Sequence, residues 1–246
     1  MKSGVALITG GARRLGRQIA LSLAGQGFDI VLSYNTSSVQ ADETSAAIER
    51  IGSECLTIKA DVSKAEEIQN LVDKSIAKFG QLDILVNNAG VFTRGLWNEI
   101  SFTTWDETLA INLTGLFLFT QAVAIEMVKR GRGRIINLAS IGGIQAWPNH
   151  IPYSLSKSGV IALTRSFARA LAPTVMVNAI APGTIIVQGE EDPAVRHIPA
   201  DAIPLKRYGL PVDITSLVVF LATNASYITG QIFPVDGGRS LDFIST

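Results

Sequence analysis

Cysteine is nearly absent from this chain, and neither sign of charge is in excess. The 246 residues include one cysteine, Cys55, so no internal disulfide can form. Lysine plus arginine and aspartate plus glutamate both number 21, which leaves no basic surface for a nucleic-acid backbone. No apolar segment with a basic leader and a small-residue cleavage site opens the sequence. These absences argue against nucleic acid as a partner and favour a reducing, cytoplasmic location.

Uninterrupted apolar runs and clusters of metal ligands are lacking as well. The longest apolar stretch, 109–125, contains four polar side chains that would each need a partner in lipid. We therefore interpret it as a buried helix and as a candidate subunit contact. The two histidines, His150 and His197, have no ligand neighbour at metal-binding spacing, so no metal is expected.

Short β-branched and aliphatic runs alternate with longer segments of helical period. The runs predict strands at 5–9, 29–33, 55–59, 82–86, 134–138, 175–180 and 231–235. The longer segments predict helices at 15–26, 38–51, 64–79, 102–129, 153–171 and 212–222, several begun by a capping residue: Ser63, Ser101 or Asp213. Such alternation is typical of a parallel sheet covered by helices on both faces. We predict an α/β fold, one domain over 1–246, with a Rossmann-type doubly wound sheet of seven parallel strands.

One region lacks this regularity. Residues 183–207 combine glycines and prolines with charges of both signs. A loop of this length in a compact domain is usually functional. We expect it to form a lid over the substrate.

A glycine-rich turn, Thr9–Gly16, joins the first predicted strand to the first helix. Glycines at such a turn let the backbone approach a pyrophosphate at the helix N-terminus, although a tight turn also needs glycine for steric reasons alone. After the second strand, 33–37 is polar and has no carboxylate to repel a 2′-phosphate, and Arg13 offers a cation for that phosphate. This combination favours NADPH over NADH, with a solvated surface arginine as the alternative for Arg13.

Further motifs follow at the ends of later strands. In chain order they are Asp61-Val62, Asn87-Asn88-Ala89-Gly90, Asn112, Ser140, Tyr153 with Lys157, Pro182-Gly183 and Asp236-Gly237-Gly238. Together with the glycine turn, they resemble the short-chain dehydrogenase/reductase family in order and spacing over nearly the whole chain. The resemblance, with the turn, implies an NADPH site made of Gly10, Arg13, Arg14, Leu15, Gly16, Ser33, Asn35, Asp61, Val62, Asn88, Ala89, Gly90, Tyr153, Lys157, Pro182 and Gly183.

The spacing of Tyr153 and Lys157 places both side chains on one face of a helix. A phenol titrates near ~10, and a nearby ammonium would lower that pKa, so that Tyr153 can act as the proton donor to the atom that receives hydride. Ser140 would donate a hydrogen bond to the same atom. In the family the lysine also binds the nicotinamide ribose, and an asparagine at the position of Asn112 orders a water beside it. An ordinary surface pair is the alternative for the tyrosine and lysine on spacing alone.

The substrate is less clearly indicated. Arg14 stands where most relatives have a glycine, and with Phe92 it resembles the pteridine reductases, in which these side chains contact a flat pterin; Trp147 is a further candidate contact. Those enzymes carry an aspartate where this chain has Ser140, which suits a ketone instead. The stretches 203–209 and 227–231 resemble 3-oxoacyl-thioester reductases.

We therefore weigh a pterin-like substrate, slightly favoured, against a 3-oxoacyl thioester or another carbonyl. A non-catalytic NADPH sensor is the alternative of another class. Kinship also implies a homotetramer.

Overall fold

A seven-stranded parallel sheet organises the molecule, and its strand order is β3-β2-β1-β4-β5-β6-β7. The computed structural model describes residues 3–189 and 198–241. The strands are β1 Gly4–Ile8, β2 Phe28–Tyr34, β3 Cys55–Lys59, β4 Ile84–Asn87, β5 Gly133–Leu138, β6 Val175–Pro182 and β7 Ile232–Val235. All six neighbouring pairs are parallel. The predicted fold class is confirmed, and β4 begins two residues later than the sequence indicated.

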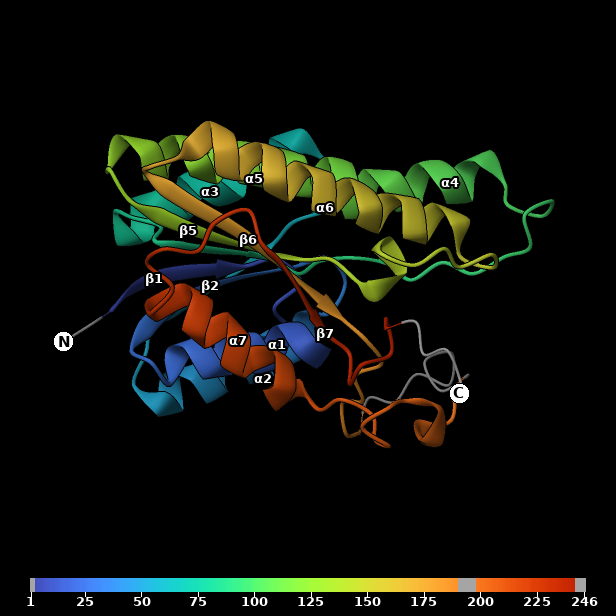
Figure 1. Ribbon diagram of the computed structural model, residues 1–246. Helices are drawn as coiled ribbons and strands as arrows, with labels where there is room; N and C mark the ends of the chain where they lie inside the picture. Colours follow the sequence, from blue (N-terminus) through green and yellow to red (C-terminus); the bar gives the residue numbers. More distant parts are fainter. Residues whose placement is uncertain (1–2, 190–197, 242–246) are drawn as a thin grey trace.

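Helices cover both faces of this sheet (Figure 1). On one side lie α1 Arg14–Ala24, α2 Ser38–Ile51 and α7 Pro211–Thr223. On the other lie α3 Ala65–Phe79, α4 Phe102–Leu109, α5 Gly115–Lys129 and α6 Ile151–Leu171. A π-helical turn, Ala110–Thr114, joins α4 to α5, and two short 3₁₀ turns lie at Ile141–Gly143 and Ala200–Ala202.

Alternating side chains of the strands supply two separate cores. In β2, Ile30 and Leu32 belong to the cluster under α1 and α7, whereas Val31 between them belongs to the cluster under α3 and α5. This is the period of two expected of a strand buried on both faces.

The apolar stretch 109–125 lies within a helical run, Phe102–Lys129, that is long and apolar enough to cross a membrane by length and composition. Phe119 and Val123 of this run are fully buried in the core cluster beneath α3 and α5, so the prediction of a buried helix is confirmed for that face.

Two of the three predicted helix caps differ from the observed ones. Ser101 caps α4, since its hydroxyl accepts from the Thr104 amide at 3.0 Å. The residue that caps α3 is Lys64 rather than Ser63, because the Ser63 hydroxyl donates to Asp61 Oδ1 at 2.7 Å. Asp213 lies in the first turn of α7 rather than before it, and its carboxylate accepts from the Leu210 amide at 2.7 Å.

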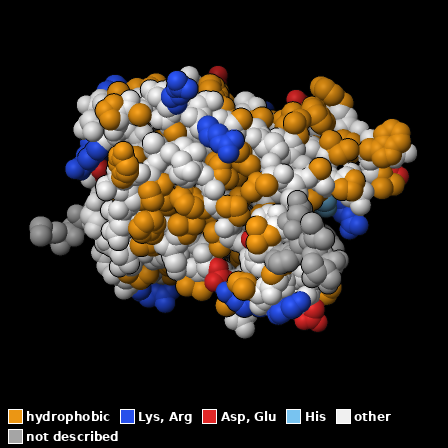
Figure 2. Space-filling view, in the orientation of Figure 1, with side chains coloured by type: hydrophobic (Ala, Val, Ile, Leu, Met, Phe, Trp, Pro, Cys, Tyr) orange, Lys and Arg blue, Asp and Glu red, His pale blue; other side chains and the backbone are white. Residues whose placement is uncertain are grey.

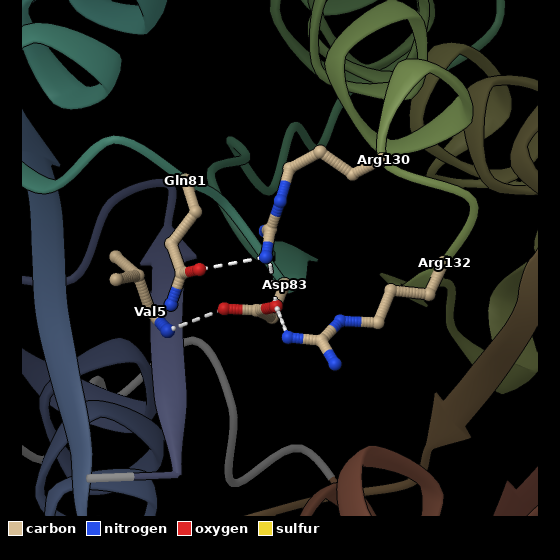
Figure 3. Close-up of polar contacts among 5 residues, drawn as sticks. All are labelled: Val5, Gln81, Asp83, Arg130 and Arg132. Atoms are coloured by element: carbon tan, nitrogen blue, oxygen red, sulfur yellow. Dashed lines mark hydrogen bonds and ion pairs between the residues drawn. The ribbon is translucent and has the colours of Figure 1, made fainter.

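A carboxylate ties the strands together at the amino ends of β1 and β4 (Figure 3). Asp83 Oδ2 accepts from the Val5 amide at 2.9 Å, and Oδ1 pairs with Arg130 at 3.1 Å and with Arg132 at 3.4 Å. Arg130 also donates to Gln81 at 2.6 Å. The opposite, carboxyl edge of the sheet is left for a ligand.

Candidate active site

A cavity of about 500 Å³ opens at the carboxyl ends of β1, β4, β5 and β6. It brings together the glycine turn, the segments after β4 and β5, the start of α6 and the segment after β6. The predicted site residues that line it are Arg14, Leu15, Asn88, Gly90, Phe92, Ser140, Trp147, Tyr153, Lys157, Pro182 and Gly183. Residues far apart in sequence therefore meet in one place, as the motif order implied.

Two neighbouring side chains hold the glycine turn in place. The Gly10 amide donates to Ser33 Oγ at 3.2 Å, and Asn88 Nδ2 donates to the carbonyls of Thr9 and Gly10 at 2.9 and 3.1 Å. A Cβ on Gly16 would collide with the Gly10 carbonyl. The turn is thus as tight as backbone sterics permit, and it places the start of α1 against the cavity, where amide groups can receive an anion.

Ser33 and Asn35 occupy different environments, although both were predicted to contact the cofactor. Ser33 is fully buried and engaged with Gly10, so its place is beneath the turn. Asn35 and Arg13 are exposed, and Arg13 precedes the first residue of α1. Arg13 and Asn35 are accessible to a 2′-phosphate, whereas Ser33 would affect cofactor binding only through the glycine turn that it supports.

Arg14 has a left-handed backbone, with φ of 51°. A side chain in this region costs about 1 kcal/mol or more relative to glycine, which explains the glycine that the family pattern has there. The Arg14 side chain lines the cavity. The residue with the strained backbone thus carries a cationic side chain, which faces the cavity.

Asp61 lies beyond β3 and keeps its charge. Its Oδ1 accepts from the Ser63 amide at 2.9 Å, and these hydrogen bonds from Ser63 lower the pKa of the Asp61 carboxyl. The neighbouring Val62 carbonyl lies against Gly115, where a Cβ would collide with it. Ala89 donates its amide to Thr9 Oγ1 at 3.0 Å, so the segment after β4 is fixed to the end of β1.

Ser140, Tyr153 and Lys157 form a contiguous group on one wall. The Ser140 side chain accepts from the Gly142 amide at 3.0 Å and is hydrogen-bonded to the Tyr153 phenol. Lys157 is buried, lies 5.9 Å from the centre of the Tyr153 ring, and donates to the Leu138 carbonyl at 2.7 Å. The spacing of these residues therefore does not reflect an ordinary surface pair.

The expected lowering of the tyrosine pKa is wrong for this structure. Burial raises the pKa of Tyr153, and the hydrogen bond from Ser140 opposes this without overcoming it. Burial also lowers the pKa of Lys157 to about 8. Desolvation disfavours the charged form of each group, and it is the largest cause of both shifts.

Asn112 lies in the π-helical turn and holds the segment after β4. Its Oδ1 accepts from the Val91 amide at 2.8 Å, and its Nδ2 donates to the Val91 carbonyl at 2.9 Å and to Ser156 Oγ at 3.1 Å. Insertions of this kind often occur at functional sites, because they change the direction of one side chain. The water-ordering role stays a prediction.

An aromatic cluster closes the other side of the cavity. Phe92 stacks on His150 with ring centres 4.5 Å apart and an interplanar angle of 19°, and it meets Tyr153 edge-on at 4.8 Å. Trp147 lies parallel to Tyr153 at 6.3 Å. His150 is buried and contacts the Thr93 carbonyl through Nδ1 at 2.7 Å. One face of Phe92 is therefore already covered by this chain.

Sequence reasoning missed Arg239, which also lines the cavity. It follows the predicted Asp236-Gly237-Gly238 motif, and only the folded chain places it beside Trp147, 5.2 Å from that ring. Its nearness to the motif was the available signal. A chain position near a motif does not by itself indicate which way a side chain points.

The predicted lid, 183–207, lies only partly within the described residues. Ile185 pairs with Gly209, and the Tyr208 hydroxyl donates to the Ile198 carbonyl at 2.8 Å. Val187 and Ile198 line the cavity. Residues 190–197, which include His197, lie outside the described residues, so the lid stays a prediction. Among the residues that the structure does describe, no group of His, Cys, Asp and Glu could hold a metal ion.

Known proteins match this chain over almost its full length. The family model described as "Enoyl-(Acyl carrier protein) reductase" matches residues 10–240. The chain belongs to the short-chain dehydrogenase/reductase family. A 3-oxoacyl-[acyl-carrier-protein] reductase from Synechocystis is 42% identical over 237 residues, which cover 95% of this chain and 96% of that protein. One from Staphylococcus epidermidis is 38% identical, with 95% and 97% coverage.

Solved structures agree with this assignment. An acetoin dehydrogenase from Salmonella typhimurium is 34% identical, with a TM-score of 0.91 and coverage of 100% of this chain and 99% of that one. A levodione reductase is 32% identical, with a TM-score of 0.92 and coverage of 99% and 100%. The protein is thus an oxidoreductase of this family, and these relatives agree with the carbonyl alternative better than with pterin reduction.

Proposed function

We propose that this protein is an NADPH-dependent reductase of 3-oxoacyl thioesters. The observation that carries the proposal is the hydroxyl pair of Ser140 and Tyr153 beside buried Lys157, in a cavity at the carboxyl edge of the sheet. The similarity to 3-oxoacyl-[acyl-carrier-protein] reductases supports the substrate class. A cytoplasmic location and a homotetramer remain expectations.

The cavity fits a nicotinamide cofactor. Added Cβ atoms at Gly10 and Gly16 would lie too close to their neighbours. Because both residues lack a side chain, a cofactor phosphate can approach the backbone amides at the start of α1. Arg13 and Asn35 are exposed at the ends of the first two strands, where the family places the adenosine ribose. When bound, the cofactor supplies the hydride; Lys157 is the side chain that would hold its nicotinamide half, and Asn88 would act through the glycine turn that it holds.

The protein's own part is to hold and deliver one proton. Because burial raises its pKa, the Tyr153 phenol stays protonated at neutral pH, as a donor to a carbonyl oxygen must. The Ser140 hydroxyl lies beside the same phenol, and when its single proton turns from the phenol to the substrate it donates the second hydrogen bond to that carbonyl oxygen. Lys157 stabilises the phenolate left after proton transfer, since its ammonium lies on the same wall.

Two observations favour the carbonyl substrate over the pterin. Ser140 supplies a neutral hydroxyl rather than a carboxylic acid for proton relay. Phe92, which a flat heterocycle would use as a stacking surface, already has one face against His150. The Arg14 side chain still lines the cavity, and we assign it to the cofactor phosphates.

The test is loss of NADPH absorbance with a 3-oxoacyl thioester, a dihydropterin and a simple quinone as substrates. We expect turnover of the thioester, and we expect Tyr153→Phe to lower kcat by about a hundredfold or more with NADPH affinity nearly unchanged. Turnover of the dihydropterin alone would restore the pterin interpretation. NADPH binding without turnover of any substrate would favour a sensor.

A further inference from the structure

Arg239 is a half-buried cation on the substrate side of the cavity. Its guanidinium lies 5.2 Å over the Trp147 ring, and one of its nitrogens donates to Thr184 Oγ1 at 2.8 Å. Gln145 donates to its backbone carbonyl at 3.3 Å, which fixes the residue to the loop before α6. These contacts come from two different segments, the loop before α6 and the segment after β6, so the position of the side chain is defined by the fold.

Within the described residues, this guanidinium uses little of its hydrogen-bonding capacity. Within 3–189 and 198–241, Thr184 is the one hydrogen-bond acceptor of its side chain, and no carboxylate lies within ion-pair distance. Asp236 attracts the guanidinium, but its oxygens already accept the Gly238 and Ser240 amides at 2.9 and 2.6 Å. A guanidinium has five N–H donors in a fixed fork, so several remain for a ligand.

The charged side chains in the described part of the cavity lining are all cations. They are Arg14, Arg94, Lys157 and Arg239, and this lining includes no aspartate or glutamate. Burial lowers the pKa of Arg239, and the nearby Asp236 carboxylate opposes this in part. An anion from outside would oppose it further, through a bidentate pair if it were a carboxylate.

We propose that Arg239 selects substrates that carry an anionic group, such as a carboxylate, several bonds away from the reacting carbonyl. Trp147 is close to both groups: its ring lies 6.3 Å from that of Tyr153 and 5.2 Å from the Arg239 guanidinium. A substrate whose carbonyl reaches Tyr153 can therefore extend past the indole and place its anionic end on Arg239. This proposal rests on the carbonyl reductase function proposed above and narrows its substrate class.

The experiment compares a straight-chain oxo acid with its methyl ester, because the two share a carbonyl and differ in charge. With NADPH we expect kcat/KM for the acid to exceed that for the ester by roughly ten- to a hundredfold. Arg239→Gln should remove this preference, mainly by raising KM for the acid. Arg239→Lys should keep part of it, because an ammonium retains the charge without the fork.

A distant arginine provides the matched control. Arg50 is exposed on α2, and Arg50→Gln removes the same charge while leaving the acid-to-ester ratio unchanged. An equal effect of Arg239→Gln on acid and ester, or a wild-type preference for the ester, would overturn the proposal while the reductase function stands.

A second measurement does not depend on turnover. In the presence of NADP⁺, a saturated straight-chain carboxylate should raise the Tm of the wild type, and its methyl ester should not. Arg239→Gln should abolish that difference. If neither oxo compound is reduced, turnover of the 3-oxoacyl thioester tests the proposed function separately, and the thermal shift decides whether Arg239 binds the anion: an equal shift with acid and ester contradicts it.

Discussion

Lys157 is buried yet must work as a cation, and this conflict sets the pH dependence of the site. Its pKa is lowered from 10.5 to about 8 because burial disfavours the ammonium. Below pH 8 the folded and unfolded chains both carry the proton. Between about 8 and 10.5 the unfolded chain binds more protons than the folded chain, so stability should rise with pH over that window.

We expect this rise to disappear in Lys157→Met. Without cofactor, the free energy of unfolding of the wild type should increase relative to the variant by roughly 1 to 2 kcal/mol between about pH 7.5 and about pH 9.5. Urea unfolding of both proteins across that pH range measures the difference in their free energies of unfolding. The contributions of the titratable groups that the two proteins share cancel in this difference. Parallel curves would show that Lys157 keeps an ordinary pKa.

At the scale of elements, the decisive contact is between the glycine turn and the start of α1. A Cβ at Gly16 would collide with the Gly10 carbonyl and lie 2.6 Å from Asn88 Nδ2. Gly25, just after the same helix, has φ of −62°, and a Cβ there would meet the Leu21 and Ser22 carbonyls at ordinary distances of 3.5 Å. The position of Gly16 therefore has no room for a Cβ, whereas the position of Gly25 has.

Gly16→Ala should separate the turn from β4. We expect a loss of about 2 kcal/mol or more in the free energy of unfolding and at least about a tenfold weaker affinity for NADPH. Gly25→Ala, the matched control, should be neutral or stabilising by about 0.5 kcal/mol, because alanine reduces the freedom of the unfolded chain. Denaturant unfolding and fluorescence titration with NADPH measure both. Similar behaviour of the two variants would contradict the steric account.

At the scale of the whole molecule, the two edges of the sheet have different roles. The carboxyl edge carries the cavity, whereas the amino edge is held by Asp83 and its partners (Figure 3). The Asp83 side chain is only 13% exposed, and the Arg132 side chain that pairs with it is 69% exposed. Loss of the buried acceptor leaves the Val5 amide without a partner, while loss of an exposed ion pair matters little.

Asp83→Ala should therefore destabilise the protein by about 2 to 3 kcal/mol and leave KM for NADPH unchanged. Arg132→Ala should change stability by less than about 0.5 kcal/mol. Urea unfolding and steady-state kinetics of each variant provide the comparison. A changed KM in Asp83→Ala would mean that the two edges are coupled.

Assembly is also decided at this scale, and the homotetramer stays a prediction. β7 is an edge strand, and apolar side chains gather over this edge of the sheet between α6 and α7 (Figure 2). Phe220 on α7 and Ile125 on α5 are 41% and 52% exposed. Surfaces of this kind suit symmetric contacts, and light scattering would measure the oligomeric state.

The sequence by itself determined the strand and helix order, because hydrophobic periodicity and glycine turns are local signals. It also indicated the candidate catalytic set, because Ser140, Tyr153 and Lys157 match the motif order of the short-chain dehydrogenase/reductase family. It misplaced the cap of α3, where Ser63 had two partners to choose between and bonds Asp61 instead.

Only the tertiary structure decided the electrostatics of the site. The pKa of Tyr153 depends on burial, which is a sum over segments that meet only after folding. Ser33 was expected at the cofactor and lies beneath the turn, because the inward or outward direction of a strand residue depends on what packs on each face. Arg239 reaches Trp147 through the return of the chain after β7. Local pattern predicts which residues form elements, whereas burial and charge environment come from contacts between distant segments.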